Sequence, residues 1–186
     1  MTDVDILQQM VKDAVKQPLA DAYKKKQVIL KEPQNPNFPV TISGLPDKAI
    51  VIKADAFKSP DTVFAGTKGE CKRADFVIIA ESNDNKVILF IEMTVGKKTE
   101  KEIIQQLKGA KCFVAYCREI GIAFWEKDDF LDNYKYRYIS IKHANISKKK
   151  TRIETQAGVH DRPERLMKIH YSPHALHFNH LAGLNR

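Results

Sequence analysis

The sequence predicts a single α/β domain, spanning 1–186, in which a mixed β-sheet is flanked by helices. Near-continuous β-branched and apolar runs at 74–80 and 86–94 surround the turn cluster 82–85, a pattern typical of a buried β-hairpin. Apolar residues then recur at helical spacing from residue 99 onward. The 186-residue chain is 43% hydrophobic and 29% charged, which suits one globular domain that buries a core without disulfide bonds.

The part of the chain before the hairpin is expected to form a helix and two edge strands. Residues 1–26 are interpreted as a helical preface, with apolar side chains on one side and a break or kink at Pro18. Edge strands are expected at 27–31 and 48–53, on either side of a proline-marked stretch. The segment 54–68 is expected to be a loop that leads toward the hairpin.

The register of the hairpin brings two carboxylates together. A two-residue loop at 83–84 and a four-residue loop at 82–85 give the same pairing, which sets Asp75 directly opposite Glu92. Directly paired residues share one face of a sheet, with Cβ atoms about 5 Å apart. Carboxylates this close repel each other unless a cation lies between them, and oxygen ligands favour Mg²⁺ or Mn²⁺. The alternative is that both acids are solvated strand-end charges, each paired with a neighbouring lysine.

The segment after the hairpin is predicted to be one long helix. Thr99 and Glu102 have the spacing of a capping box at its start. A core-facing stripe is formed by Ile103, Leu107, Ala110, Val114 and Cys117. Gly109 leaves a second interpretation, in which the helix ends there and a strand follows, but the apolar spacing favours the long helix. Gln105 and Lys108 lie on an adjacent stripe that could border the carboxylates.

With these residues in place, the chain resembles the PD-(D/E)xK nuclease superfamily over about 69–143. The family motif is an Asp on one strand and Glu-x-Lys on the next; Asp75 and Glu92 match its acids, and Thr94 stands where the lysine is expected. The resemblance implies a restriction-endonuclease-like core of a helix, a three-strand meander, a crossover helix and a further strand. It also implies a Mg²⁺- or Mn²⁺-dependent endonuclease in which Asp75 and Glu92 are catalytic and bind the metal.

Thr94 matches a variant of the superfamily, similar to the cap-snatching endonucleases, in which the following helix carries the lysine. By this resemblance Lys108 is the expected catalytic lysine, and the loop residues Lys97 and Lys98 are its rivals. The Met93 carbonyl is expected as a further metal ligand. The upstream histidine often found in that branch is absent, because the first histidine of the chain follows the predicted helix.

Glu70 is a further candidate ligand. It lies just before the first arm of the hairpin and could bind a second metal ion. The alternative is an exposed loop acid paired with Lys68 or Lys72.

The chain is strongly basic, with a net charge of +8 and a pI near 9.3, which favours a polyanionic partner. The residues expected to bind nucleic acid are Lys97, Lys98, Lys148, Lys149, Lys150 and Arg152. Phosphate contacts of this kind supply affinity that does not depend on base sequence. The alternative for any one lysine cluster is a solvated surface.

A basic, histidine-containing extension is expected at about 144–186, after a strand at 134–143. Tyrosines alternate along this strand and either bind bases or form half-buried sheet surface. A helix is expected from Ser172, near four histidines at intervals of three and four residues: His170, His174, His177 and His180. Because no cysteine and no H-E-x-x-H pattern lies nearby, a surface or partner-facing helix is favoured over a zinc site.

The remaining features concern cellular setting. Cys71, Cys112 and Cys117 lack the spacing of a zinc or disulfide site, and the last two are expected to be buried in the helix. No apolar run has the length of a membrane span and no leader pattern is visible, so a cytoplasmic protein without a membrane partner is expected.

Together these features predict a metal-dependent nuclease that hydrolyses phosphodiester bonds in DNA or RNA. The alternative is a non-catalytic nucleic-acid-binding or assembly subunit with a decayed nuclease fold. A protein-interaction subunit or an unrelated α/β enzyme is the third class. The sequence leaves open whether the chain acts alone, as a homodimer or in a larger complex.

Overall fold

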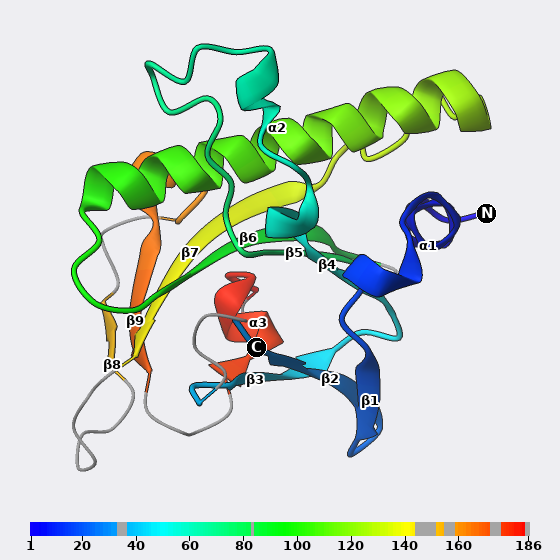
Figure 1. The fold of residues 1–186 in the computed structure, drawn as a ribbon. Helices are drawn as coiled ribbons and strands as arrows, with labels where there is room; N and C mark the ends of the chain where they lie inside the picture. The colour runs from blue at the N-terminus through cyan, green and yellow to red at the C-terminus, as the bar shows by residue number, and fades with distance from the viewer. Residues whose placement is uncertain (33–36, 83, 144–151, 155–158, 172–175, 185–186) are drawn as a thin grey trace.

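The structure is a computed structural model and describes residues 1–32, 37–82, 84–143, 152–154, 159–171 and 176–184 (Figure 1). The helices are α1 (Asp3–Met10), α2 (Glu100–Trp125) and α3 (Phe178–Leu181), with short 3₁₀ turns at Asp13–Val15, Ala54–Ala56, Pro60–Thr62 and Pro163–Arg165. The strands are β1 (Leu19–Ala22), β2 (Lys25–Leu30), β3 (Val40–Leu45), β4 (Lys48–Lys53), β5 (Phe76–Glu81), β6 (Lys86–Thr94), β7 (Lys135–His143), β8 (Arg152–Glu154), β9 (Met167–Tyr171) and β10 (Leu176–His177).

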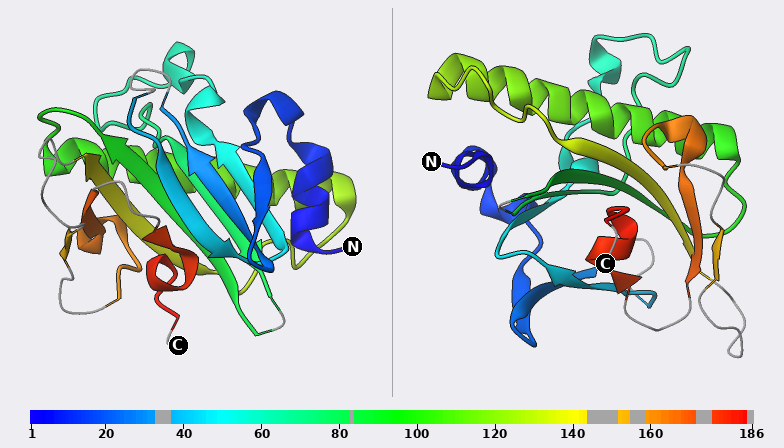
Figure 2. Two further views of the ribbon diagram at one scale, coloured as in Figure 1. Left: turned by 90° about the horizontal axis from the view of Figure 1, so that it is seen from below. Right: turned by 180° about the vertical axis from the view of Figure 1, so that it is seen from behind.

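These elements form three layers. α2 covers one face of a six-stranded sheet with the order β4-β5-β6-β7-β9-β8. A four-stranded sheet with the order β1-β2-β3-β10 lies on the other side, together with α3 (Figure 2). The expected mixed α/β fold with flanking helices is confirmed, and the second sheet is an addition that the sequence did not indicate.

The large sheet is built from a meander and a crossover. β4, β5 and β6 pair antiparallel in chain order, α2 crosses the sheet, and β7 pairs parallel with β6. β9 continues the sheet parallel to β7, and β8 pairs antiparallel with β9. The strands predicted at 48–53 and 134–143 are therefore present as β4 and β7.

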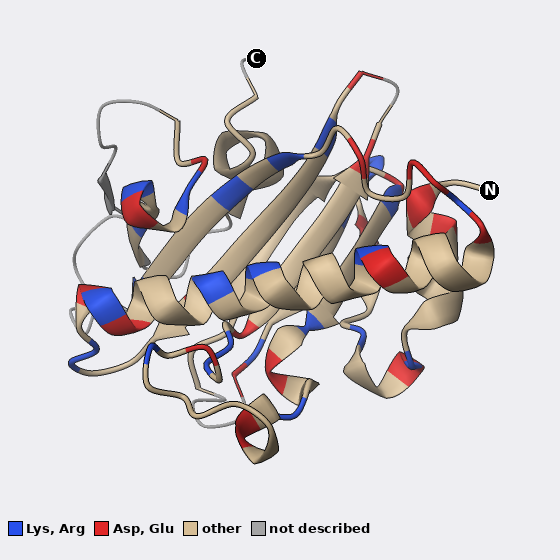
Figure 3. Cartoon of the chain, turned by 90° about the horizontal axis from the view of Figure 1, so that it is seen from above, with Lys and Arg blue, Asp and Glu red and all other residues tan. Residues whose placement is uncertain are grey.

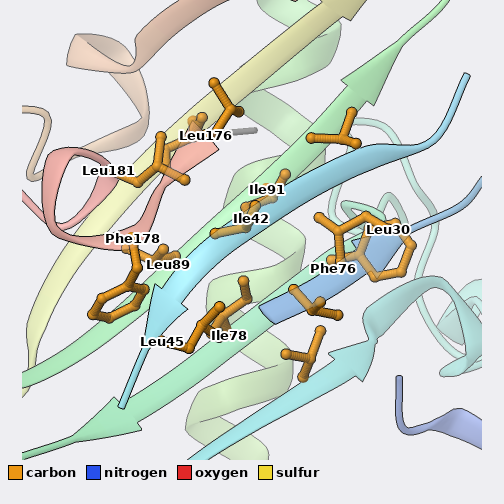
Figure 4. Close-up of a cluster of buried hydrophobic side chains, with 14 of the residues drawn as sticks. Leu30, Ile42, Leu45, Phe76, Ile78, Leu89, Ile91, Leu176, Phe178 and Leu181 are labelled. Carbon is orange, nitrogen blue, oxygen red and sulfur yellow. The ribbon is translucent and has the colours of Figure 1, made fainter. Parts of the chain in front are cut away.

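β5 and β6 are buried on both faces, which explains their near-continuous apolar sequences. On the face toward α2, Val77, Ile79 and Phe90 belong to one core with Leu107 and Val114 of the helix. The core on the opposite face joins the hairpin to the small sheet and to α3 (Figure 4); it includes Leu30, Ile42, Ile78, Leu89, Phe178 and Leu181.

α2 runs unbroken through Gly109, so the long-helix prediction is confirmed. Thr99 and Glu102 form the predicted capping box: the Thr99 hydroxyl accepts from the Glu102 N–H, and the Glu102 carboxylate accepts from the Thr99 N–H. At Gly109 a Cβ atom would collide with the carbonyl oxygen of Lys72. The glycine therefore lets the helix press directly on the chain that leads into β5. Cys112, which was predicted to be buried, is exposed instead.

The N-terminal segment differs from the helical preface expected over 1–26. The α-helix covers only Asp3–Met10, and a β1–β2 hairpin begins at Leu19. Tyr23 and Lys24 adopt positive φ in its turn. The helical part therefore ends before Pro18, where a break or kink was predicted, and strand pairing begins at the next residue. β2 lies between β1 and β3, so the strand expected at the edge is an inner one.

The C-terminal segment also differs from the single helix expected from Ser172, a residue outside the described ones, because Leu176–His177 pair as strand β10 and only the short helix α3 follows. His170 lies on β9, His177 on β10 and His180 on α3, so these residues are not successive turns of one helix. His174 lies outside the described residues. β10 pairs parallel with β3 and closes the small sheet with a strand from the far end of the chain.

Candidate active site

Two carboxylates lie together at the end of the β5–β6 hairpin. The ladder pairs Phe76 with Ile91, so the next pair outward is Asp75 and Glu92, as predicted from the turn. Both side chains point toward the α2 face, because the residues two positions along each strand belong to the core beneath α2. Asp75 is 8% exposed and Glu92 is 0% exposed. The alternative of solvated strand-end charges is therefore wrong as to exposure, although Glu92 does pair with a lysine of the following loop, as that alternative expected.

The backbone of Met93 contacts Asp75. The Asp75 Oδ2 atom accepts a hydrogen bond of 2.6 Å from the Met93 N–H. In an extended strand the N–H and C=O of one residue point to the same neighbouring strand, so the Met93 carbonyl faces the same side. The Met93 side chain belongs to the core on the opposite face. Met93 thus meets the acid pair through its backbone alone.

Lys98 reaches the acid pair from the loop between β6 and α2. Its Nζ atom donates a hydrogen bond of 2.6 Å to Glu92 Oε1. The other carboxylate oxygen, Oε2 of Glu92, is buried and has no hydrogen-bond partner among the described residues. A buried carboxylate oxygen in this state carries a large desolvation cost, which a cation would offset.

The electrostatics of the pair favour its protonated form when no metal is bound. Burial, and secondly the charge of Glu92, raise the pKa of Asp75 to about 8, although the Met93 N–H opposes the shift. Burial raises the pKa of Glu92 to about 7, against the opposing effect of the hydrogen bond from Lys98. Burial alone would lower the pKa of Lys98, but the hydrogen bond and charge of Glu92 outweigh it, and the net shift is upward.

Glu32 is a third acid near the pair, and no motif in the sequence marks it as part of the site. It follows β2, and its charge raises the pKa of both Asp75 and Glu92. The only local signal was an acid directly after a strand that was expected at 27–31. Its proximity to Asp75 depends on how the small sheet packs under the large one, which no local pattern encodes.

The donor set fits one hard divalent cation. Asp75 and Glu92 offer carboxylate oxygens, and the Met93 carbonyl offers a third oxygen on the same side. Such a cation would neutralise the repulsion between the two acids and satisfy the unpaired Oε2 of Glu92. Across the described segments, no group of three or more His, Cys, Asp or Glu side chains is arranged to hold a metal.

Lys108, the expected catalytic lysine, is engaged elsewhere. Its Nζ atom lies 2.6 Å from Glu164 Oε1, and both side chains are about half exposed. Lys98, one of its two rivals, is the lysine that contacts the acid pair. Lys97 is exposed in the same loop.

Glu70 is bound to its own loop. Its carboxylate accepts hydrogen bonds from the N–H groups of Gly66 and Lys68, at 2.9 and 2.8 Å. These backbone hydrogen bonds lower the pKa of Glu70. Gln105 of α2 donates to the Lys68 carbonyl and so attaches this loop to the helix. The role of Glu70 in binding a second metal stays a prediction.

The residues expected to bind nucleic acid are only partly described. Lys148, Lys149 and Lys150 lie outside the described residues, and Arg152 begins the edge strand β8. Figure 3 shows lysines and arginines on α2 and on neighbouring strands and loops, interleaved with acids. Tyr134 and Tyr138 are buried in the core beneath α2, so the half-buried-sheet interpretation of the alternating tyrosines is the correct one.

Comparison of the chain with family models, with curated proteins and with solved structures found no match. Among the helices of the described segments, none combines the length and apolar composition needed to cross a bilayer.

Proposed function

We propose that this protein is a Mg²⁺- or Mn²⁺-dependent nuclease that hydrolyses phosphodiester bonds in DNA or RNA. The observation that carries the proposal is the buried pair of Asp75 and Glu92 on one face, with one carboxylate oxygen unpaired and Lys98 beside it. Two like charges in this position are costly to a purely structural domain, so a role in binding a cation accounts for them.

The topology supports the same proposal. α1, the β4–β5–β6 meander, α2 and the parallel strand β7 follow one another in the order of a PD-(D/E)xK core, with the β1–β2–β3 strands between α1 and β4. In such a core Asp75 and Glu92 occupy the positions of the motif acids. The chain departs from the motif at Thr94, a buried residue on the α2 face that cannot supply a positive charge.

Lys98 replaces the motif lysine in this proposal. When bound, the metal ion would supply Lewis-acid activation of water and of the scissile phosphate. Asp75, Glu92 and the Met93 carbonyl would hold the ion at the end of the hairpin. With Glu92 engaged as a ligand, the Lys98 ammonium would be available to stabilise the negative charge that develops on the phosphate oxygens.

The test is cleavage of single-stranded and duplex DNA and RNA with Mg²⁺, with Mn²⁺ and in EDTA. Activity is expected only with metal, and Asp75→Asn and Glu92→Gln should each reduce it roughly 100-fold or more, because each removes a ligand charge. Glu164→Gln is the matched control, since it removes a carboxylate that pairs with Lys108 on the surface. Wild-type rates in both acid variants would refute the proposal.

A non-catalytic nucleic-acid-binding subunit is the second candidate. The ion pair between Lys98 and Glu92 favours it, because this lysine neutralises one acid without any metal. Binding of Mn²⁺ measured by calorimetry separates the two candidates. A decayed site binds the ion no better than the Asp75→Asn variant does.

A further inference from the structure

A hollow of about 490 Å³ lies between the segment that joins β4 to β5 and the middle of α2. Figure 1 shows this segment passing along the outer side of the helix. The volume is in the range of small-ligand sites in proteins. Neither the acid pair nor Lys98 lines the hollow, so it is a separate feature.

The walls of the hollow are aromatic. Phe57 lies 5.3 Å from Phe113 and 6.1 Å from Tyr116, measured between ring centroids, and Phe64 lines the same space. Phe64 and Tyr116 are 55% and 56% exposed. Exposed apolar side chains gathered in one hollow are a feature of ligand-binding grooves. The Phe57 ring is tilted by 45° against Phe113 and by 49° against Tyr116, and the exposed rings offer apolar surface to an aromatic ligand.

The lining of the hollow is mainly apolar, and two cationic residues, Lys72 and Arg73, contribute to it. Glu70 also lines it, but its carboxylate is already bound to two backbone N–H groups of its own loop. Aromatic walls beside two cations match a ligand that carries both a ring and negative charge, as a nucleotide does.

The hollow is connected to the acid pair by a short piece of chain. Lys72 lies against Gly109 of α2, and three residues later the chain reaches Asp75. Three extended residues span at most about 10 Å. A strand whose phosphate lies at the acid pair therefore has a neighbouring nucleotide within reach of the hollow.

We propose that this hollow stacks an unpaired base of the substrate strand and that the nuclease acts on single-stranded or unpaired nucleic acid. The inference rests on the proposed function for its substrate. In a duplex both faces of a base are covered by its neighbours, so a base must leave the helix to enter such a site. An acidic peptide with aromatic residues is the competing ligand, and the nearby phosphodiester site favours the nucleotide.

The test is fluorescence anisotropy of the whole chain, in EDTA, with a labelled single strand and with the same sequence as a duplex. Tyr116→Ala and Phe57→Ala should each weaken single-strand binding about 5- to 150-fold, the loss of one stacked base. Tyr116→Phe should restore it. Phe124→Ala is the matched control, because Phe124 is 78% exposed on α2 and does not line the hollow. Duplex affinity should stay unchanged, and the far-UV spectrum of each variant shows whether it is folded.

Unchanged single-strand affinity in both folded hollow variants would overturn the inference, and so would an equal loss of duplex affinity. Displacement of the single strand by an acidic aromatic peptide, lost in Tyr116→Ala, would assign the hollow to a protein partner instead. Because binding is read without metal, the two proposals fail separately. If the wild-type protein cleaves and the hollow variants bind single strands normally, only the stacking proposal is refuted. If the hollow variants lose single-strand binding but the wild-type protein does not cleave with any metal tested, only the nuclease proposal is refuted.

Discussion

The Asp75 carboxylate accepts a hydrogen bond of 2.6 Å from the backbone N–H of Met93, the residue that follows Glu92 on the facing strand. This bond ties the side chain of one acid to the strand that carries the other. The Asp75 carboxylate is thus held by the hairpin itself, whereas the Glu92 carboxylate is held by Lys98 from the following loop. A site held in this way is organised before substrate arrives, which is what electrostatic catalysis requires.

The first prediction separates the two lysines. Lys98→Ala should lower kcat about 100-fold with little change in KM, because it removes a cation that acts mainly in the transition state. Lys108→Ala should leave kcat near the wild-type value, since Lys108 pairs with Glu164. Steady-state cleavage kinetics with Mn²⁺ measure both. If Lys108→Ala lowers kcat and Lys98→Ala does not, Lys108 of α2 is the catalytic lysine instead.

The second prediction concerns pH and metal. The pKa of Asp75 is raised from 3.8 to about 8 and that of Glu92 from 4.5 to about 7, so at these two groups the metal-free folded protein binds more protons than the unfolded chain. Their contribution to stability should therefore fall as the pH rises from about 4 to about 8, and it opposes that of buried His160, whose pKa is lowered by burial. Mn²⁺ should raise Tm more at the upper end of this range than at the lower end.

Asp75→Asn is the control for this pH dependence. Asparagine can still accept the Met93 N–H through its side-chain oxygen but carries no charge, so much of the decrease in Tm with pH should disappear. Thermal unfolding in EDTA across the same pH range tests whether Asp75 causes the decrease in Tm. A variant that retains the wild-type slope would show that other groups are responsible.

The third prediction uses Glu32. Because its charge raises the pKa of both acids, Glu32→Gln should lower those pKa values and shift the rise of Mn²⁺ affinity to lower pH. Titration calorimetry at several pH values measures the shift. Glu119→Gln, a surface substitution on α2 at a side chain that is 71% exposed, should leave the profile in place.

The fourth prediction concerns the contact between α2 and the chain before β5. Gly109→Ala should reduce the free energy of unfolding by about 1–3 kcal/mol, since the new methyl group meets the Lys72 carbonyl oxygen. The substitution should also weaken Mn²⁺ binding, because Lys72, which the new methyl group meets, lies only three residues before Asp75. Ala115→Ser, an exposed change on the same helix, should alter stability by less than about 0.5 kcal/mol. Urea unfolding of the two variants gives the comparison.

The parts of the site that could be predicted from sequence depend on local rules. The turn fixes the register of Asp75 and Glu92, and the capping box of Thr99 fixes the start of α2. The choice between Lys98 and Lys108 needed the path of the loop before α2, which residue spacing does not give.

Longer-range features could not be predicted. Glu32 approaches the acids only because the small sheet packs under the large one. The N-terminal segment is helical over α1, yet from Leu19 onward it pairs as strands, β1 with β2 and β2 with β3. The effect of Gly109 on the helix could not be predicted for the same reason. The Lys72 carbonyl oxygen, which leaves no room for a side chain at this position, belongs to another part of the chain.

The parallel pairing of β10 with β3 has a consequence for biosynthesis. Leu176 pairs with Ile42, so one edge of the small sheet is completed by almost the last described part of the chain. While the ribosome is still making this segment, the face of the large sheet that Phe178 and Leu181 cover stays open. A chain that lacks this segment would therefore expose apolar surface between the two sheets, which favours aggregation. A chain truncated just after β9 would still contain the hairpin with both acids, but its core between the two sheets would be exposed to water.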